Sequence, residues 1–127
     1  MAECVLDSSA VLAWLNLERG SQAVEPMLSV ALVSAVNLAE IVTRLVDTGR
    51  TDEEAIDLIL GADFQIADFD SRLALRAGAL RRQTRHLGLS LGDRACLALA
   101  ERERLPVLTA DRAWASLDIG VEIRLIR

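Results

Sequence analysis

The stretch LSLGDRACLALAERERLPVLTAD, residues 89–111, sets an acidic side chain at the edge of each of two apolar segments. Asp93 stands close before residues 95–100, which carry no charge, and Asp111 follows Val107 and Leu108. A buried carboxylate without a partner is costly. Acids in these positions therefore need a structural or a chemical reason.

The same stretch predicts a helix followed by a buried strand. Ser90 and Asp93 have the spacing of a capping box, with Asp in place of the usual Glu, and begin a helix that runs to about residue 104. Working outward, similar patterns predict strands over 4–6, 31–33, 64–67, 106–109 and 121–126. They predict helices over 10–17, 21–28, 34–48, 51–61, 70–87 and 112–117. Strands that alternate with helices indicate an α/β fold with a parallel sheet covered on both faces.

Composition limits the class of protein. At 127 residues and 52% hydrophobic, the chain is expected to form a single domain, 1–127, with a sizeable core. An aromatic fraction of 3% argues against base stacking, so Trp14 and Trp114 are expected in core or interface packing. All 14 basic residues are Arg, which excludes a P-loop lysine. Cys4 and Cys96 are far apart in the sequence, which indicates free thiols in a reducing compartment. The N-terminus has no basic leader and no segment is long and apolar enough to span a membrane, so a cytoplasmic location is expected.

Four acids adjoin apolar sequence at the start or end of a predicted element: Asp7, Glu40, Asp93 and Asp111. Each has an ordinary explanation when taken alone, as a turn former, as a helix cap, or (for Glu40) as a partner of Arg44 on a solvated helix face opposite the core. Together they are expected to meet, because sites in parallel sheets form at the carboxyl ends of the strands. Mutually repelling carboxylates favour a divalent cation, and oxygen ligands suit Mg²⁺ or Mn²⁺.

A carboxylate–metal site restricts the chemistry. The chain has one histidine, His86, and no HExxH motif, so neither a Ser–His–Asp set nor a typical zinc site is indicated. Magnesium sites position phosphates and activate water, which points to phosphodiester hydrolysis or phosphoryl transfer. Five arginines without an acid between them lie on the predicted helix 70–87, either as a solvated face or as a surface for a phosphate-rich substrate. They are Arg72, Arg76, Arg81, Arg82 and Arg85.

Four motifs, VLDSSAVLAWL, NLAE, LSLGDRACLALA and VLTADRAW, span residues 5–114 and resemble those of the PIN domain, more narrowly the VapC toxins of type II toxin–antitoxin systems. The resemblance implies a three-layer α/β/α fold with a mostly parallel sheet of about four to five strands. It also implies a Mg²⁺- or Mn²⁺-dependent endoribonuclease that cleaves structured RNA such as tRNA or rRNA, forms a homodimer and is inhibited by a cognate VapB-type antitoxin.

The resemblance carries the catalytic and metal-binding roles over to the four acids. It assigns supporting roles to Ser9, Asn37 and Thr109, and we regard Arg81, Arg82 and Arg85 as the candidate RNA contacts. Gly92 departs from the family, where many members have Ala, and is expected to loosen the first turn of its helix.

Two alternatives stay open. A PIN-like binding or regulatory module without useful turnover would bind metal but leave RNA intact. A small-molecule phosphohydrolase would use Asp7 as a nucleophile, although LDSSA lacks the second acid, two residues on, that common aspartyl-phosphate phosphatases carry.

Overall fold

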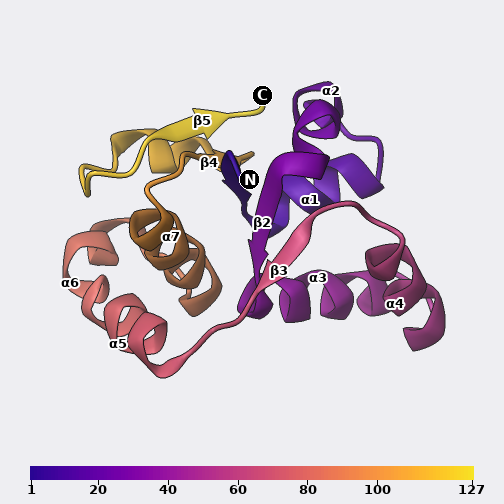
Figure 1. The fold of residues 1–127 in the computed structure, drawn as a ribbon, viewed down its shortest axis with the longest axis horizontal. Helices are drawn as coiled ribbons and strands as arrows, with labels where there is room; N and C mark the ends of the chain where they lie inside the picture. The colour runs from indigo at the N-terminus through magenta and orange to yellow at the C-terminus, as the bar shows by residue number, and fades with distance from the viewer.

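A computed structural model describes residues 1–127 and contains a five-stranded, fully parallel sheet between two layers of helices (Figure 1). The strands are β1 (Cys4–Leu6), β2 (Ala31–Ser34), β3 (Gln65–Ala67), β4 (Val107–Thr109) and β5 (Ile123–Leu125), in the order β3-β2-β1-β4-β5. The predicted α/β/α architecture is therefore confirmed. Strands β1 and β4 are neighbours at the centre, so the residues that follow them start from the same edge of the sheet.

The sheet separates two apolar clusters. One layer holds α1 (Ser8–Leu15), α2 (Ser21–Val24), the 3₁₀ helix η1 (Glu25–Val30), α3 (Ala35–Asp47) and α4 (Asp52–Leu60). The other holds α5 (Ser71–Ala79), α6 (Arg81–Thr84), η2 (Arg85–Leu87), α7 (Leu91–Glu103) and η3 (Arg112–Ser116). Side chains of a strand alternate between the layers, so Cys4 and Leu6 pack in the first cluster and Val5 in the second. No helix is long and apolar enough to cross a membrane.

Helix α7 explains the apolar segment in the stretch 89–111. It packs against α3, α5 and strands β1 and β2, and every residue from Ala95 to Ala100 is buried. A helix covered on most sides loses the usual polar stripe. Trp114 is fully buried in the same layer and Trp14 packs against the other cluster, as expected for packing residues.

The single helix predicted over 70–87 is wrong. The chain breaks at Leu80 into α5, α6 and η2. The Leu80 carbonyl accepts hydrogen bonds from the N–H groups of Gln83 and Thr84 and from the Thr84 hydroxyl, at 3.1, 3.1 and 2.9 Å. Leu80 and Thr84 are both fully buried. Back-bonding by threonine bends helices, and here the turn keeps both side chains inside the molecule.

Two other helices differ from the prediction in detail. Helix α1 begins at Ser8, two residues before the predicted start, because the Asp7 side chain caps it by accepting from the Ala10 N–H. The weak helix predicted over 21–28 is α2 followed by η1, with Pro26 in the first turn of the 3₁₀ segment. Proline removes a backbone donor, which favours this change of helix type.

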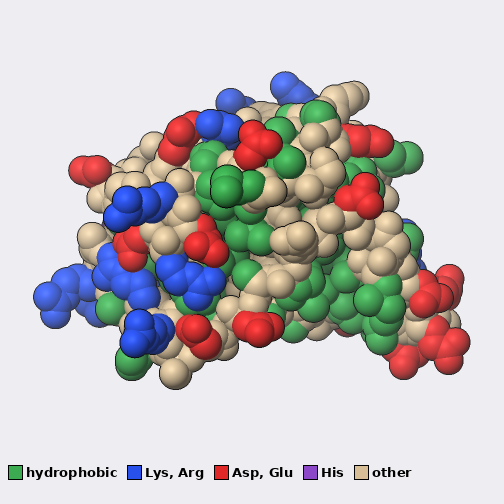
Figure 2. Space-filling model, viewed as in Figure 1, with side chains coloured by type: hydrophobic (Ala, Val, Ile, Leu, Met, Phe, Trp, Pro, Cys, Tyr) green, Lys and Arg blue, Asp and Glu red, His purple; other side chains and the backbone are tan.

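Charged side chains are unevenly distributed over the surface. Figure 2 shows basic groups gathered over α5 and α6 and acidic groups at the opposite end, over α4. Arg81, Arg82 and Arg85 are exposed, so this basic patch is available to solvent.

Candidate active site

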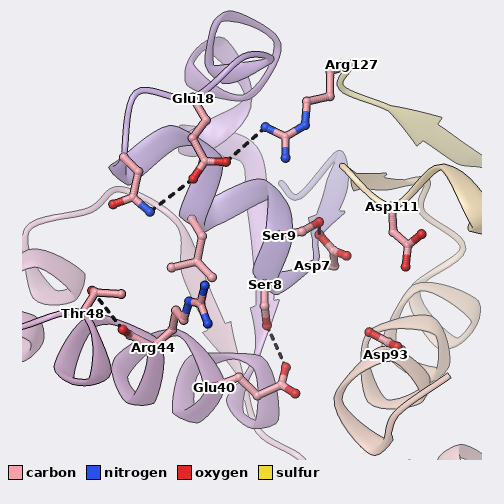
Figure 3. Close-up of a pocket in the computed structure, with 12 residues that line it drawn as sticks. Asp7, Ser8, Ser9, Glu18, Glu40, Arg44, Thr48, Asp93, Asp111 and Arg127 are labelled. Atoms are coloured by element: carbon pink, nitrogen blue, oxygen red, sulfur yellow. Dashed lines mark hydrogen bonds and ion pairs between the residues drawn. The ribbon is translucent and has the colours of Figure 1, made fainter.

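The four predicted acids line one pocket (Figure 3). Asp7 directly follows β1 and Asp111 comes two residues after β4, so the pairing of these strands brings both to one edge of the sheet. Asp93 lies in the first turn of α7 and Glu40 in the middle of α3. Four separate elements therefore contribute one carboxylate each, which is the convergence expected from the sequence.

Asp7 is the buried member of the set, with 4% of its surface exposed. Its Oδ1 accepts hydrogen bonds from the Ser9 hydroxyl at 2.7 Å and the Ala10 N–H at 2.9 Å. Its Oδ2 accepts from the Thr109 hydroxyl at 2.8 Å. Burial raises the pKa of Asp7 to about 6, the three hydrogen bonds oppose this shift, and the Asp93 charge adds to it. Asp7 is thus rigidly held and costly to ionise.

Ser9 and Thr109 also join the two strand ends. The Ser9 hydroxyl accepts from the Ala110 N–H at 2.9 Å, and the Thr109 hydroxyl accepts from the Asp111 N–H at 3.0 Å. The Asp111 side chain is exposed and caps η3 by accepting from the Ala113 N–H at 3.0 Å. These contacts hold together the two backbone segments that carry Asp7 and Asp111.

Asp93 is a helix cap and a pocket residue at once. Its Oδ2 accepts from the Ser90 N–H at 2.9 Å, while its own N–H donates to the Ser90 hydroxyl, which completes the predicted capping box. The pKa of Asp93 is raised by burial, with further contributions from the charges of Glu40 and Asp111. The capping role predicted for this residue and its place among the acids are therefore compatible.

No ion pair joins Glu40 to Arg44, so the pairing considered from the sequence as an ordinary explanation for Glu40 does not form. Glu40 Oε1 accepts instead from the Ser8 hydroxyl at 2.7 Å and from Asn37 Nδ2 at 2.9 Å. Asn37, three residues before Glu40, is 1% exposed, so this side of α3 is not a fully solvated face. Asn37 Nδ2 reaches the Gly92 carbonyl of α7 at 3.1 Å, because α3 packs against α7 along this side.

Sequence reasoning did not assign Ser8 to the pocket, and it considered Arg44 only as a partner of Glu40. Ser8 was one of a run of small residues with no distinguishing pattern, and its role depends on α3 lying beside α1. Arg44 lines the pocket without an acidic partner, whereas the other pocket arginine, Arg127, binds Glu18 at 3.1 Å and the Arg19 carbonyl at 2.9 Å. The only sequence signal for Arg44 was its position four residues after Glu40.

The donor set fits a hard divalent cation. All four acids offer carboxylate oxygens, two of them have raised pKa values, and Arg44 is the only cationic side chain of the pocket that is free of acidic partners. No three acidic, histidine or cysteine side chains are placed to hold one ion between them. Mg²⁺ commonly uses only one or two carboxylates and keeps several waters, so the pocket suits it without a complete protein cage.

The predicted RNA-contacting arginines lie outside this pocket. Arg81 and Arg82 are on α6 and Arg85 is on η2, in the segment that leads into the α7 N-terminus. Arg76, on α5, is engaged elsewhere, because it donates to both carboxylate oxygens of Glu101 on α7 at 2.6 and 2.8 Å. Arg76 therefore joins two helices, and its guanidinium is not free for a substrate.

Fold and site together define an α/β/α protein with a cluster of carboxylates at the carboxyl edge of its parallel sheet. The PIN domain family model matches residues 4–120. The chain belongs to the PIN domain family. No curated protein sequence matches the chain significantly.

Solved structures share the fold over nearly the whole chain. DNA-bound VapBC from Salmonella typhimurium has a TM-score of 0.77 at 18% identity, covering 100% of both chains. VapC20 from Mycobacterium tuberculosis, described as a sarcin-ricin loop cleaving toxin, has a TM-score of 0.73 at 15% identity, covering 94% of this chain and 99% of that one. VapBC-5 from the same organism has a TM-score of 0.66 at 24% identity, covering 100% and 99%. Such identities establish a common fold.

Proposed function

We propose that this protein is a Mg²⁺- or Mn²⁺-dependent endoribonuclease and the toxin of a type II toxin–antitoxin pair. The observation that carries the proposal is the meeting of Asp7, Glu40, Asp93 and Asp111 in one pocket of a PIN domain. Similar structures are toxin–antitoxin complexes, and one relative is described as cleaving the sarcin-ricin loop, which is RNA. RNA phosphodiester bonds are therefore the proposed substrate class, in tRNA or rRNA.

The four acids are the proposed metal-holding and catalytic residues. Asp7 is held by Ser9, Ala10 and Thr109, so it needs no reordering to meet a cation. Asp93 and Glu40 each use one carboxylate oxygen in hydrogen bonds within the protein and keep the other free of such bonds. A bound divalent cation would supply water activation and neutralise charge on the reacting phosphate.

Substrate and partner would meet the protein through opposite charges. Arg81, Arg82 and Arg85 form an exposed basic patch suited to RNA phosphates, and Arg44 places a free guanidinium beside the acids. The acidic pocket itself suits a basic segment of a VapB-type antitoxin, which would compete with the cation for the same carboxylates. A homodimer is part of the same proposal, by analogy with the family.

The first experiment is cleavage of total cellular RNA by purified, antitoxin-free protein with Mg²⁺, with Mn²⁺ and with EDTA. We expect discrete fragments with either metal and none with EDTA or with Asp7→Asn. Asp63→Asn is the matched control, because Asp63 is an exposed acid outside the pocket. Absence of cleavage in every lane, together with calorimetric metal binding, would overturn broad RNase activity and support the binding-module alternative.

A further inference from the structure

Gly92, in the first turn of α7, leaves space that the Glu40 carboxylate occupies. Gly92 is buried, and a Cβ built on it would overlap both carboxylate oxygens and the carboxyl carbon of Glu40. Its φ is not in the left-handed region, so the backbone itself does not require glycine here. The contact with Glu40 is therefore the feature that distinguishes this glycine.

Two donors hold Glu40 in this space. The Ser8 hydroxyl from α1 and the Asn37 amide from α3 both donate to Oε1. Asn37 also donates to the Gly92 carbonyl, so the amide that binds Glu40 is tied to α7 as well. Oε2 accepts no hydrogen bond from the protein and lies on a carboxylate that lines the acidic pocket. The arrangement fixes one oxygen and leaves the other available.

We propose that Gly92 is a positioning residue for Glu40: its missing Cβ provides the space in which Ser8 and Asn37 hold the carboxylate ready for a divalent cation. This inference rests on the metal site of the proposed function. A larger residue at position 92 displaces the Glu40 carboxylate from both donors. Loss of groups that orient a metal ligand typically weakens metal affinity by about 10–100-fold.

The fold tolerates this change, which makes the position testable. The atoms in conflict are the far end of a flexible side chain, so Glu40 rotates away without backbone movement. Alanine also favours a helix more than glycine does. Gly92→Ala is therefore expected to keep the melting temperature of the metal-free protein near that of the wild type while changing the site.

The experiment is a calorimetric titration of metal-free, full-length protein with Mn²⁺, which needs no RNA. We expect Gly92→Ala to weaken Mn²⁺ binding about 10–100-fold. Gly78→Ala is the matched control, because Gly78 is also helical, on α5, and a Cβ there meets nothing within 4 Å. The control is expected to bind Mn²⁺ as the wild type does.

A double-mutant cycle tests whether the effect passes through Glu40. In a Glu40→Ala background, Gly92→Ala is expected to cause no further loss of Mn²⁺ affinity. An undiminished affinity in Gly92→Ala, or an equal loss in the Glu40→Ala background, overturns the proposal while leaving the nuclease assignment intact. Wild-type protein that binds no Mn²⁺ overturns the metal site and this inference with it.

Ser8→Ala provides a second test of how Glu40 is held, and it leaves the sequence of α7 unchanged. It removes one of the two donors to Oε1 without adding bulk near Gly92. We expect a smaller loss of Mn²⁺ affinity than in Gly92→Ala, and again none in the Glu40→Ala background. An unchanged Mn²⁺ affinity in Ser8→Ala counts against the proposal that Ser8 and Asn37 hold the Glu40 carboxylate for the cation. This test remains valid if Gly92→Ala does not fold.

Discussion

Asp7 combines two demands that conflict at the level of one residue. It is almost completely buried, yet the proposed chemistry needs it ionised. Hydrogen bonds from Ser9, Ala10 and Thr109 offset part of the cost of burial, but the pKa of Asp7 is still raised, so part of that cost remains. Without a cation, an ionised Asp7 destabilises the folded state.

Asp7→Asn is therefore expected to stabilise the metal-free protein at pH 7.5, by about 1–3 kcal/mol. Between the unfolded pKa of 3.8 and the folded pKa of about 6, the folded state binds more protons. The contribution of Asp7 to wild-type stability therefore falls as pH rises through this window. Urea unfolding in EDTA at pH 7.5 and pH 4.5 checks this, and the advantage of Asp7→Asn must shrink at the lower pH. Equal stabilities at pH 7.5 would contradict it, and Asp63→Asn serves as control.

Arg44 supplies a second prediction for a single residue. Because its guanidinium is exposed in the pocket and has no acidic partner, we expect it to contact a substrate phosphate near the reacting one. Arg44→Ala should raise KM for RNA by roughly 3–10-fold, equivalent to about 1 kcal/mol for one exposed charged contact, with less change in kcat. Arg50→Ala, outside the pocket, is the control. A fall in kcat at constant KM would refute this role.

At the scale of elements, the breaks and ends of helices place the functional groups. The break at Leu80 turns α6 and η2 away from the line of α5, so Arg81, Arg82 and Arg85 do not form one continuous helical face with Arg72. The capping box at the start of α7 sets Asp93 in the pocket. Arg76, by contrast, binds Glu101 and holds α5 to α7.

The basic patch on α6 and η2 is expected to bind RNA backbone without sequence preference. A triple change of Arg81, Arg82 and Arg85 to Ala should weaken binding of total tRNA in EDTA, where no cleavage competes. The slope of log affinity against log salt should become shallower by about 0.7 for each phosphate that the variant no longer neutralises. Fluorescence anisotropy over a salt series measures this. An unchanged slope would assign the patch to a solvated surface.

For the whole molecule, the fold concentrates negative charge at one edge of the sheet in a chain of net charge −5. Two buried or half-buried carboxylates there have raised pKa values, so their ionisation opposes folding when no cation is bound. Divalent cations should therefore act as stabilising ligands as well as cofactors.

Mn²⁺ is expected to raise the melting temperature of the wild-type protein. At a concentration 100 times its Kd, the ligand adds about 2.7 kcal/mol to the free energy of unfolding. Asp7→Asn should lose most of this response, whereas Asp63→Asn should keep it. Thermal unfolding followed by circular dichroism over a Mn²⁺ series gives the comparison. A melting temperature independent of Mn²⁺ in the wild type would contradict a metal site in the folded state.

Local sequence was sufficient to predict the parallel sheet, the capping of α7 and the carboxyl-edge positions of Asp7 and Asp111. These features depend on short patterns: apolar segments of strand length, a capping spacing, and acids one or two residues after strands. Such patterns can be recognised because strand and helix periodicities repeat every two or about 3.6 residues.

The surroundings of Glu40, the break at Leu80 and the isolation of Arg44 depend instead on how the elements pack. Ser8 on α1 and Gly92 on α7 meet Glu40 from helices that are distant from α3 in the chain, and Asn37, on α3 itself, joins Glu40 to α7. Periodicity indicates which face of a helix or strand is apolar. It does not indicate which elements pack together or which group a buried polar side chain contacts. Those contacts arise from close packing, which local sequence does not encode.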